Sequence, residues 1–176
     1  MNDERMAPLS HFFDLGDLSQ AGSRVHIDAK GDDLTRLAHW AGVDEVRSFA
    51  AQVELSRLSR TRFAYEAELE ADIVQSCVVT LEPVTTHIVR HISRDLHFSP
   101  RLHAESGELT LAAGDENTPE EIPSLDYDLA APLLEEFVLS IDPYPRKQGA
   151  AFEPPAQPVE PPESPFGVLK KLKEPG

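Results

Sequence analysis

The segment from Thr61 to Gln75, TRFAYEAELEADIVQ, alternates apolar and polar side chains along its whole length and constrains the fold more tightly than any other segment. The apolar members are Phe63, Tyr65, Ala67, Leu69, Ala71 and Ile73. Four of the side chains between them are acidic: Glu66, Glu68, Glu70 and Asp72. Because successive side chains of a strand point to opposite faces, this period predicts a long strand with one face in the core and one acidic face in solvent.

Other segments predict a β-rich domain around this strand. The expected strands are residues 22–29, 48–60 and 86–98, and residues 32–42 are expected to form a short helix. The short connections between the central strands favour antiparallel pairing over βαβ units. Arg90 and Arg94 share the parity of the apolar residues in the last strand. That strand is therefore expected to bend, to bulge or to be only partly covered.

The C-terminal third is first acidic and then rich in proline. Residues 104–124 predict an acidic arm or loop, and residues 126–141 predict a second helix from the spacing of their leucines. The last 34 residues hold nine of the fifteen prolines. Residues 146–176 are therefore expected to form a disordered tail, which ends in a small amphipathic and basic segment, SPFGVLKKLK.

Together these patterns predict one α+β domain over residues 1–145, whose first ~10 residues are flexible. Its sheet is expected to be mainly antiparallel, to be strongly twisted or barrel-like, and to carry two helices.

The chain has a formal net charge of −15, which limits the kinds of partner it can bind. It disfavours direct binding of nucleic acid, which relies on lysine and arginine displacing counterions from phosphate, and it favours a basic protein partner. The single cysteine allows no intramolecular disulfide, and neither a signal peptide nor an apolar run long enough for a membrane span is evident. We therefore expect a cytoplasmic protein that does not contact a membrane.

The residues that could carry catalysis or bind a metal do not form a recognisable set. Thr80 stands where a C-x-x-C motif beginning at Cys77 would place its second thiol, and no activating group is near Cys77 in the sequence. His87 and His91 would lie about 13 Å apart along a strand, too far to share one zinc ion. We expect no catalytic residue, metal or cofactor, and interpret Cys77 as a buried strand side chain before a turn fixed by Pro83.

Three segments in this order resemble the YceD-like family, the large ribosomal RNA subunit accumulation proteins, in its α-proteobacterial form. They are VQSCVVTLEPV, DYDLAAPLLEEFVLSIDPYP and SPFGVLKKLK. The resemblance implies a cytoplasmic, non-enzymatic factor needed for normal levels of 23S ribosomal RNA, and hence for large-subunit assembly. The motif positions are Cys77, Leu81, Glu82, Pro83, Val84, Asp128, Leu129, Glu135 and Glu136. Because the second thiol of many members is Thr80 here, a metal or redox role is not expected of this chain.

Two surfaces are candidates for the interaction. In the first hypothesis, an acidic face receives a basic ribosomal protein or a large-subunit assembly factor, and ribosomal RNA is contacted indirectly or weakly. Its residues are Glu66, Glu68, Glu70, Asp72, Glu82, Glu135 and Glu136. In the alternative, a group of arginines binds ribosomal RNA directly, which requires them to gather on one surface. They are Arg57, Arg60, Arg62, Arg90 and Arg94.

Overall fold

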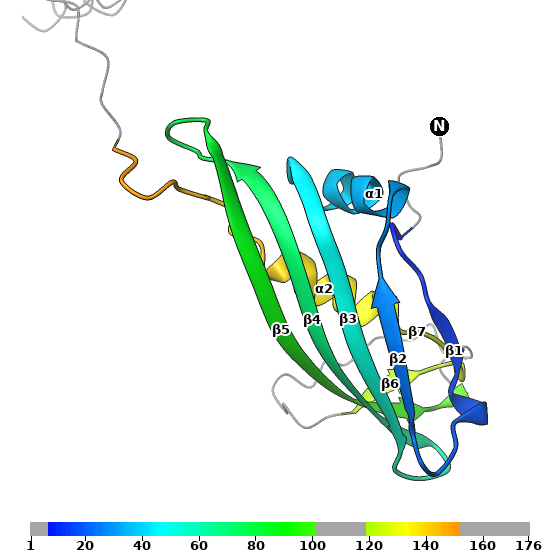
Figure 1. Ribbon diagram of the computed structural model, residues 1–176. Coiled ribbons are helices and arrows are strands. Elements are labelled where there is room, and N and C mark those ends of the chain that lie inside the picture. The colour runs from blue at the N-terminus through cyan, green and yellow to red at the C-terminus, as the bar shows by residue number, and fades with distance from the viewer. Residues whose placement is uncertain (1–6, 101–118, 152–176) are drawn as a thin grey trace, which may run out of the picture.

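The alternating segment forms the middle strand of the main sheet. Figure 1 shows the protein in a computed structural model, which describes residues 7–100 and 119–151. Its elements, in chain order, are β1 (Phe12–Asp14), the 3-10 helix η1 (Leu15–Asp17), β2 (Ser23–Asp28), α1 (Asp32–Ala41), β3 (Glu45–Arg57), β4 (Arg62–Ser76), β5 (Pro83–Phe98), β6 (Glu120–Ile122), β7 (Asp126–Asp128) and α2 (Ala130–Leu139).

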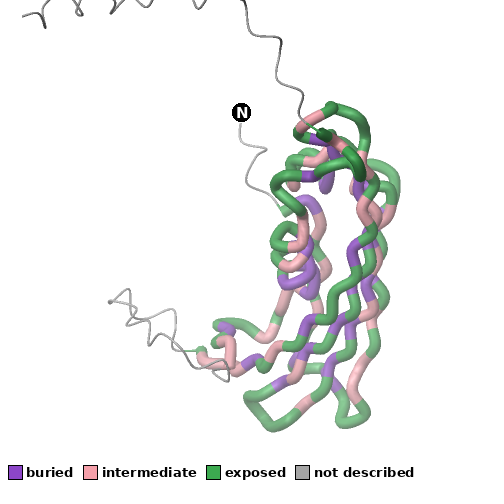
Figure 2. Tube along the Cα trace, turned by 90° about the vertical axis from the view of Figure 1, so that its left-hand side faces the viewer, coloured by how far each residue is buried: buried purple, intermediate pink, exposed green. Residues whose placement is uncertain are grey.

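Five strands form the main sheet in the order β2-β3-β4-β5-β6, and β1 and β7 form a separate antiparallel pair. Strands β2 to β5 are antiparallel to their neighbours, whereas β6 runs parallel to the end of β5. The prediction of an α+β fold with a mainly antiparallel sheet and two α-helices is confirmed. The sheet is curved (Figure 2), but it is not a closed barrel, since β2 and β6 stand at opposite ends of the strand order.

The odd-numbered side chains of β4 fill the core, as their alternation predicts. From Phe63 to Ile73 each of them is at most 7% exposed. Figure 2 shows both α-helices on the same side of the sheet. The ring of Phe49 on β3 meets that of Phe137 on α2 edge to face, with centroids 5.3 Å apart. This packing fixes α2 across one face of the sheet and leaves the opposite face to solvent.

One expectation about local structure needs correction. Residues 126–128, expected to be helical, form β7, because this segment pairs with β1 and the Asp128 carboxylate accepts the N–H groups of His11 and Ala130. The helix therefore begins only at Ala130. The expectation that β5 is only partly covered is confirmed, since Arg90 is exposed and Arg94 is half-buried on its core side. It contains no bulge, because its register against β4 has no shift. Arg90 and Arg94 share the parity of its apolar residues because they reach carboxylates of α2.

The predicted terminal segments are described only in part. Of the acidic arm expected over residues 104–124, residues 104–118 lie outside the described residues, and the remainder contains β6. The expected tail is described as far as residue 151, and its Lys147 contacts the turn between β4 and β5. Residues 1–6 and the SPFGVLKKLK segment also lie outside the described residues. Within the described ranges, no helix is both long enough and apolar enough to span a bilayer.

Candidate functional site on the open face of the sheet

The α-helices leave one face of the main sheet uncovered, and this open face is turned toward the viewer in Figure 1. It is formed by the even-numbered residues of β2 and β4, the even-numbered residues of β3 from Ser48 onward, and the odd-numbered residues of β5, which the strand register places side by side. One row across the four strands joins His26, Gln52, Glu68 and His91. The acidic residues of β4 therefore lie in the middle of the open face rather than at its rim.

Four carboxylates along β4 form what we call the acidic strip: Glu66, Glu68, Glu70 and Asp72. The other acids of the open face have basic partners, as in the ion pairs Arg24–Glu54 at 2.5 Å, Lys30–Asp28 at 2.6 Å and Arg62–Asp95 at 2.8 Å. Within the described residues, no lysine or arginine forms a salt bridge with any member of the acidic strip. The strip is therefore a line of negative charge that the fold itself does not neutralise.

The groups that do contact the acidic strip come from β5 and β3. The His87 ring lies between two of its members, with Nδ1 2.8 Å from Asp72 Oδ1 and Nε2 3.6 Å from Glu70 Oε1. The hydrogen bond with His87, and next the one from the Ser48 hydroxyl, hold the pKa of Asp72 below its usual range. At the other end of the strip, Ser93 Oγ donates to Glu66 Oε1 at 2.7 Å. These neighbours orient the carboxylates without cancelling their charge while the imidazoles are neutral.

The remaining predicted acidic residues do not join the strip. Glu135 and Glu136 lie on α2, on the opposite side of the sheet, where Glu135 accepts from Arg94 Nη2 at 2.7 Å and Glu136 lies 3.5 Å from Arg90 Nε. Glu82 lies in the turn between β4 and β5, and the Nζ of Lys147 lies 2.9 Å from its Oε1. That hydrogen bond is the main reason why the pKa of Glu82 is lowered. The acidic face expected from the sequence is thus divided between separate surfaces.

The five predicted arginines are also dispersed. Arg90 and Arg94 face α2 and form ion pairs with its carboxylates, and Arg94 also reaches Glu120 at 3.1 Å. Arg57 donates to the carbonyls of Leu15 and Gly16 and lies over the Phe63 ring. Arg62 lies on the open face in its ion pair with Asp95, and Arg60 is exposed in the turn between β3 and β4. No single surface of the described protein gathers these five side chains.

The Cys77 turn differs from its sequence-based interpretation. The thiol is fully buried, as expected, but Cys77 lies just after β4, in the turn that returns the chain to β5. Its sulfur accepts the backbone N–H groups of Val79 and Thr80, each at 3.4 Å, and that of Lys147 at 3.3 Å. A further backbone hydrogen bond joins Val78 N to Pro145 O at 2.9 Å. The turn therefore fixes the segment after α2 onto the end of the sheet.

The same contacts change the acidity of the thiol. The N–H of Lys147, together with the donors of Thr80, lowers the pKa of Cys77 to about 6, and burial opposes this shift. The lowering comes from hydrogen-bond donors of the turn and of a distant segment, and not from a histidine, a base or a helix N-terminus near Cys77 in the sequence. Its strongest donor is separated from it by 70 positions along the chain, so the local sequence carries no signal of it. The buried sulfur accepts hydrogen bonds from both the turn and the segment after α2, and so holds the two together.

Other motif positions have local structural roles. Leu81 adopts a positive φ of 61° in the turn, and its side chain is 78% exposed. Pro83 and Val84 begin β5. Asp128 and Leu129 precede α2, where the Asp128 carboxylate accepts two backbone N–H groups and the Leu129 carbonyl accepts the buried Tyr65 hydroxyl at 2.9 Å. These residues hold the end of the sheet and the start of α2 in place.

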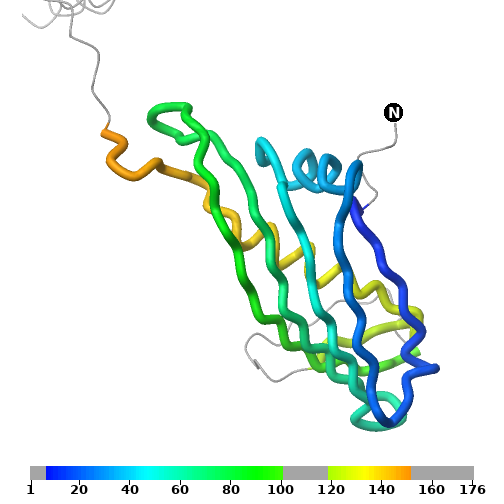
Figure 3. Tube along the Cα trace, viewed as in Figure 1, coloured from blue at the N-terminus to red at the C-terminus, as the bar shows by residue number. Residues whose placement is uncertain are grey.

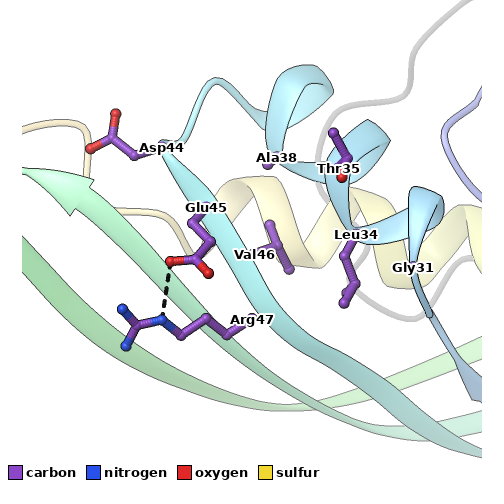
Figure 4. A pocket seen from close by; sticks show the side chains of 8 residues that line it. All are labelled: Gly31, Leu34, Thr35, Ala38, Asp44, Glu45, Val46 and Arg47. Carbon is purple, nitrogen blue, oxygen red and sulfur yellow. Dashed lines mark hydrogen bonds and ion pairs between the residues drawn. The ribbon is translucent and has the colours of Figure 1, made fainter.

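A pocket of about 360 Å³ lies between α1 and the beginning of β3, lined partly by the apolar side chains of Leu34 and Val46 (Figure 4). The charged groups of its lining already have partners. Arg47 Nε lies 3.1 Å from Glu45 Oε2, and Asp44 accepts a hydrogen bond from the Ser76 hydroxyl at 2.8 Å. The pocket therefore does not present the convergent acid–base set that a catalytic site needs. Over residues 7–100 and 119–151, no group of three His, Cys, Asp or Glu side chains is arranged to hold a metal ion.

Comparison with known proteins identifies no relative: no family model, no curated protein and no solved structure matches this chain.

Proposed function

We propose that this protein is a non-enzymatic ribosome biogenesis factor that binds a basic segment of a ribosomal protein or large-subunit assembly factor through the acidic strip. The observation that supports binding is the line of four carboxylates on the open face, which form no salt bridge to lysine or arginine within the described residues. Alternate residues of a strand lie about 6.6 Å apart. This spacing suits the lysine and arginine side chains of an extended partner segment.

The ribosomal assignment is supported by the motif resemblance, through the order of the Cys77 turn, the acidic stretch and the α2 segment. The net charge of −15 agrees with a protein partner and disfavours a direct contact with ribosomal RNA. The arginine alternative lacks a surface, because Arg90 and Arg94 are engaged by α2 while Arg62 lies on the opposite face. Ribosomal RNA is therefore reached indirectly in this proposal.

The proposed contact is governed by charge and so depends strongly on salt. An exposed ion pair contributes about 1 kcal/mol at most. Four of them would supply about 4 kcal/mol, which corresponds to a roughly millimolar complex. The Debye length is about 8 Å at physiological ionic strength, so added salt weakens the contact further. The acidic strip thus provides attraction and orientation, and a lasting complex needs further contacts beside it.

The experiment is affinity capture of ribosomal proteins and assembly intermediates by the tagged full chain at low salt. The test variant combines Glu66→Gln, Glu68→Gln and Glu70→Gln. A control with the same change in charge combines three exposed acids away from the open face: Asp17→Asn, Asp32→Asn and Asp126→Asn. We expect capture by the wild type and the control, and its loss in the test variant. Equal capture by all three, or none by the wild type, contradicts the proposal.

A further inference from the structure

Strand β5 has one edge that is almost entirely without a partner strand. Its residues 83–97 pair with β4 on one side, but on the other side β6 pairs only with Leu96–Phe98. In Figure 3, β5 forms the left margin of the sheet. Within the described residues, the stretch 83–95 therefore has no strand beyond it. A long unpaired edge of this kind is a template for an added strand.

The backbone contacts at the two ends of β5 show which residues point toward this free edge. The N–H of Phe98 bonds to Thr61 O on the β4 side, and Glu82 O accepts from Cys77 N, also on the β4 side. Ser99 N instead bonds outward to Ile122 O. In an antiparallel pair, the N–H and C=O of one residue point the same way and alternate along the strand. Because the register has no shift, the odd-numbered residues between 85 and 95 direct both groups outward.

These six residues are Thr85, His87, Val89, His91, Ser93 and Asp95, and all of them are exposed. Their side chains lie on the open face, directly beside the acidic strip. One carbonyl of the set is already used, since Val89 O accepts from Arg90 Nη1 at 2.9 Å. The free edge and the acidic strip thus belong to the same side of the molecule, and a single ligand can use both.

We propose that an extended basic segment of the partner adds to the free edge of β5 as a further strand and places its lysine or arginine side chains over the open face. This inference rests on the proposed function and specifies how the partner binds. Residues 85–95 extend about 36 Å, which suits a segment of about ten residues. An added strand would lie two strand spacings, roughly 9.6 Å, from β4. A lysine or arginine side chain and a glutamate side chain together span that distance.

The two kinds of contact have complementary roles. Main-chain hydrogen bonds to the edge supply affinity and direction without regard to sequence, as in other cases of strand addition. The acidic strip selects a segment with basic side chains at alternate positions. A second copy of this chain is disfavoured as the occupant, because each copy carries a net charge of −15 and would bring its own acidic strip toward the other.

The test uses a fluorescent decapeptide of alternating lysine and valine, together with the full chain at low salt. Amide hydrogen exchange is followed by NMR in the free and the peptide-bound protein. In the free protein, we expect slow exchange for the even-numbered amides of β5, which bond to β4, and fast exchange for the odd-numbered amides from 85 to 95. On binding, the odd-numbered set becomes slow. A peptide of the same sequence with every backbone nitrogen methylated has no N–H to donate to the outward carbonyls of β5, and it is expected to leave the odd-numbered amides fast.

A pair of variants at Val89 separates the backbone from the side chain. Val89→Pro removes one outward N–H without breaking a bond to β4. Edge strands tolerate proline where the missing N–H would face solvent. Val89→Ala shortens the same side chain and keeps the N–H. We expect Val89→Pro to bind the lysine–valine peptide at least about fivefold more weakly than Val89→Ala, the effect of one lost hydrogen bond. Slow exchange of the even-numbered amides shows that each variant is folded.

The outcomes distinguish this inference from the proposed function. If the peptide binds and the Glu66, Glu68 and Glu70 triple variant weakens it, but the odd-numbered amides stay fast, strand addition is wrong and the acidic strip stands. Failure of the peptide to bind at low salt contradicts both. Slow odd-numbered amides in the free protein overturn the choice of occupant. In that case, exchange rates that fall as the protein concentration rises identify a second copy as the occupant. Exchange rates that do not change with concentration identify a segment of the chain itself.

Discussion

Replacing Tyr65 by phenylalanine removes one buried hydroxyl and leaves the packing of the ring in place. Tyr65 is fully buried, and its hydroxyl donates to Leu129 O at 2.9 Å, so it joins β4 to the residue that precedes α2. Burial raises the pKa of Tyr65 well above its usual value, so the hydroxyl remains a donor over the whole physiological range. The variant therefore tests whether this hydrogen bond holds the start of α2 on the sheet.

The expected size of the effect follows from the acceptor. A typical hydrogen bond contributes about 1 kcal/mol net, and an acceptor left buried without a partner costs more. The Leu129 carbonyl is at the N-cap of α2, where a carbonyl accepts the first hydrogen bond of the helix, so it keeps a partner. We therefore expect Tyr65→Phe to lower the free energy of unfolding by about 1 kcal/mol. In a domain of this size, that corresponds to a fall in Tm of about 3–5 °C.

The assay is equilibrium unfolding in urea, with Tyr127→Phe as the control. The Tyr127 hydroxyl lies 3.5 Å from Glu120 Oε1 at a partly exposed position, so its loss is expected to cost less than about 0.5 kcal/mol. Equal stability of the wild type and Tyr65→Phe would show that this hydrogen bond does not stabilise the start of α2. So would a larger loss in Tyr127→Phe than in Tyr65→Phe.

Three further predictions concern charged groups. The thiolate absorbance of native Cys77 should titrate with a midpoint near pH 6. The thiolate stabilises the fold fully above the unfolded pKa of about 8.5, and this contribution should be lost as the pH falls through 6. A difference in the free energy of unfolding between wild type and Cys77→Ser that does not change with pH would contradict this. Arg94→Ala should lower the free energy of unfolding by about 1 kcal/mol, because the Arg94 side chain is only 31% exposed and pairs with two carboxylates. Arg62→Ala, which removes a single exposed ion pair, should lower it by less. Urea unfolding of both variants measures this difference, and an equal or larger loss in Arg62→Ala would contradict it. His87→Ala should raise the pKa of Asp72, since the hydrogen bond with His87 is the main cause of its lowering; an unchanged carboxyl titration by NMR would contradict the assigned contact.

The fold could be predicted from the sequence wherever a local pattern decides it. The alternation from Phe63 to Ile73 predicts β4 and its buried face, since a single strand register fixes which side chains are inside. The sequence likewise predicts the helix over residues 32–42, which is capped by Gly42 in the left-handed conformation with φ of 70°. The predicted helix over residues 126–141 started too early, because the pairing of β7 with β1 joins segments more than 100 positions apart.

The candidate site was only partly predictable, because it depends on which strands lie side by side. The sequence identifies the acidic residues of β4. It does not show that lysine and arginine side chains pair with other acids of the open face instead of with these. The sequence groups Glu135 and Glu136 with the acidic residues of β4, although α2 packs on the opposite side of the sheet. The role of His87 requires the register between β4 and β5, and the contact of Lys147 with Cys77 joins two distant turns. No local pattern carries this information.

We propose that the acidic strip recruits a basic component of the assembling large ribosomal subunit. The most direct measurement is sucrose-gradient co-sedimentation of the full chain with large-subunit precursors at low and high salt. We expect the wild type and the control variant Asp17→Asn, Asp32→Asn and Asp126→Asn to sediment with the precursors at low salt and to dissociate at high salt. The variant Glu66→Gln, Glu68→Gln and Glu70→Gln should remain at the top of the gradient under both conditions. Co-sedimentation of that variant at the wild-type level, or none by the wild type at low salt, would contradict the account.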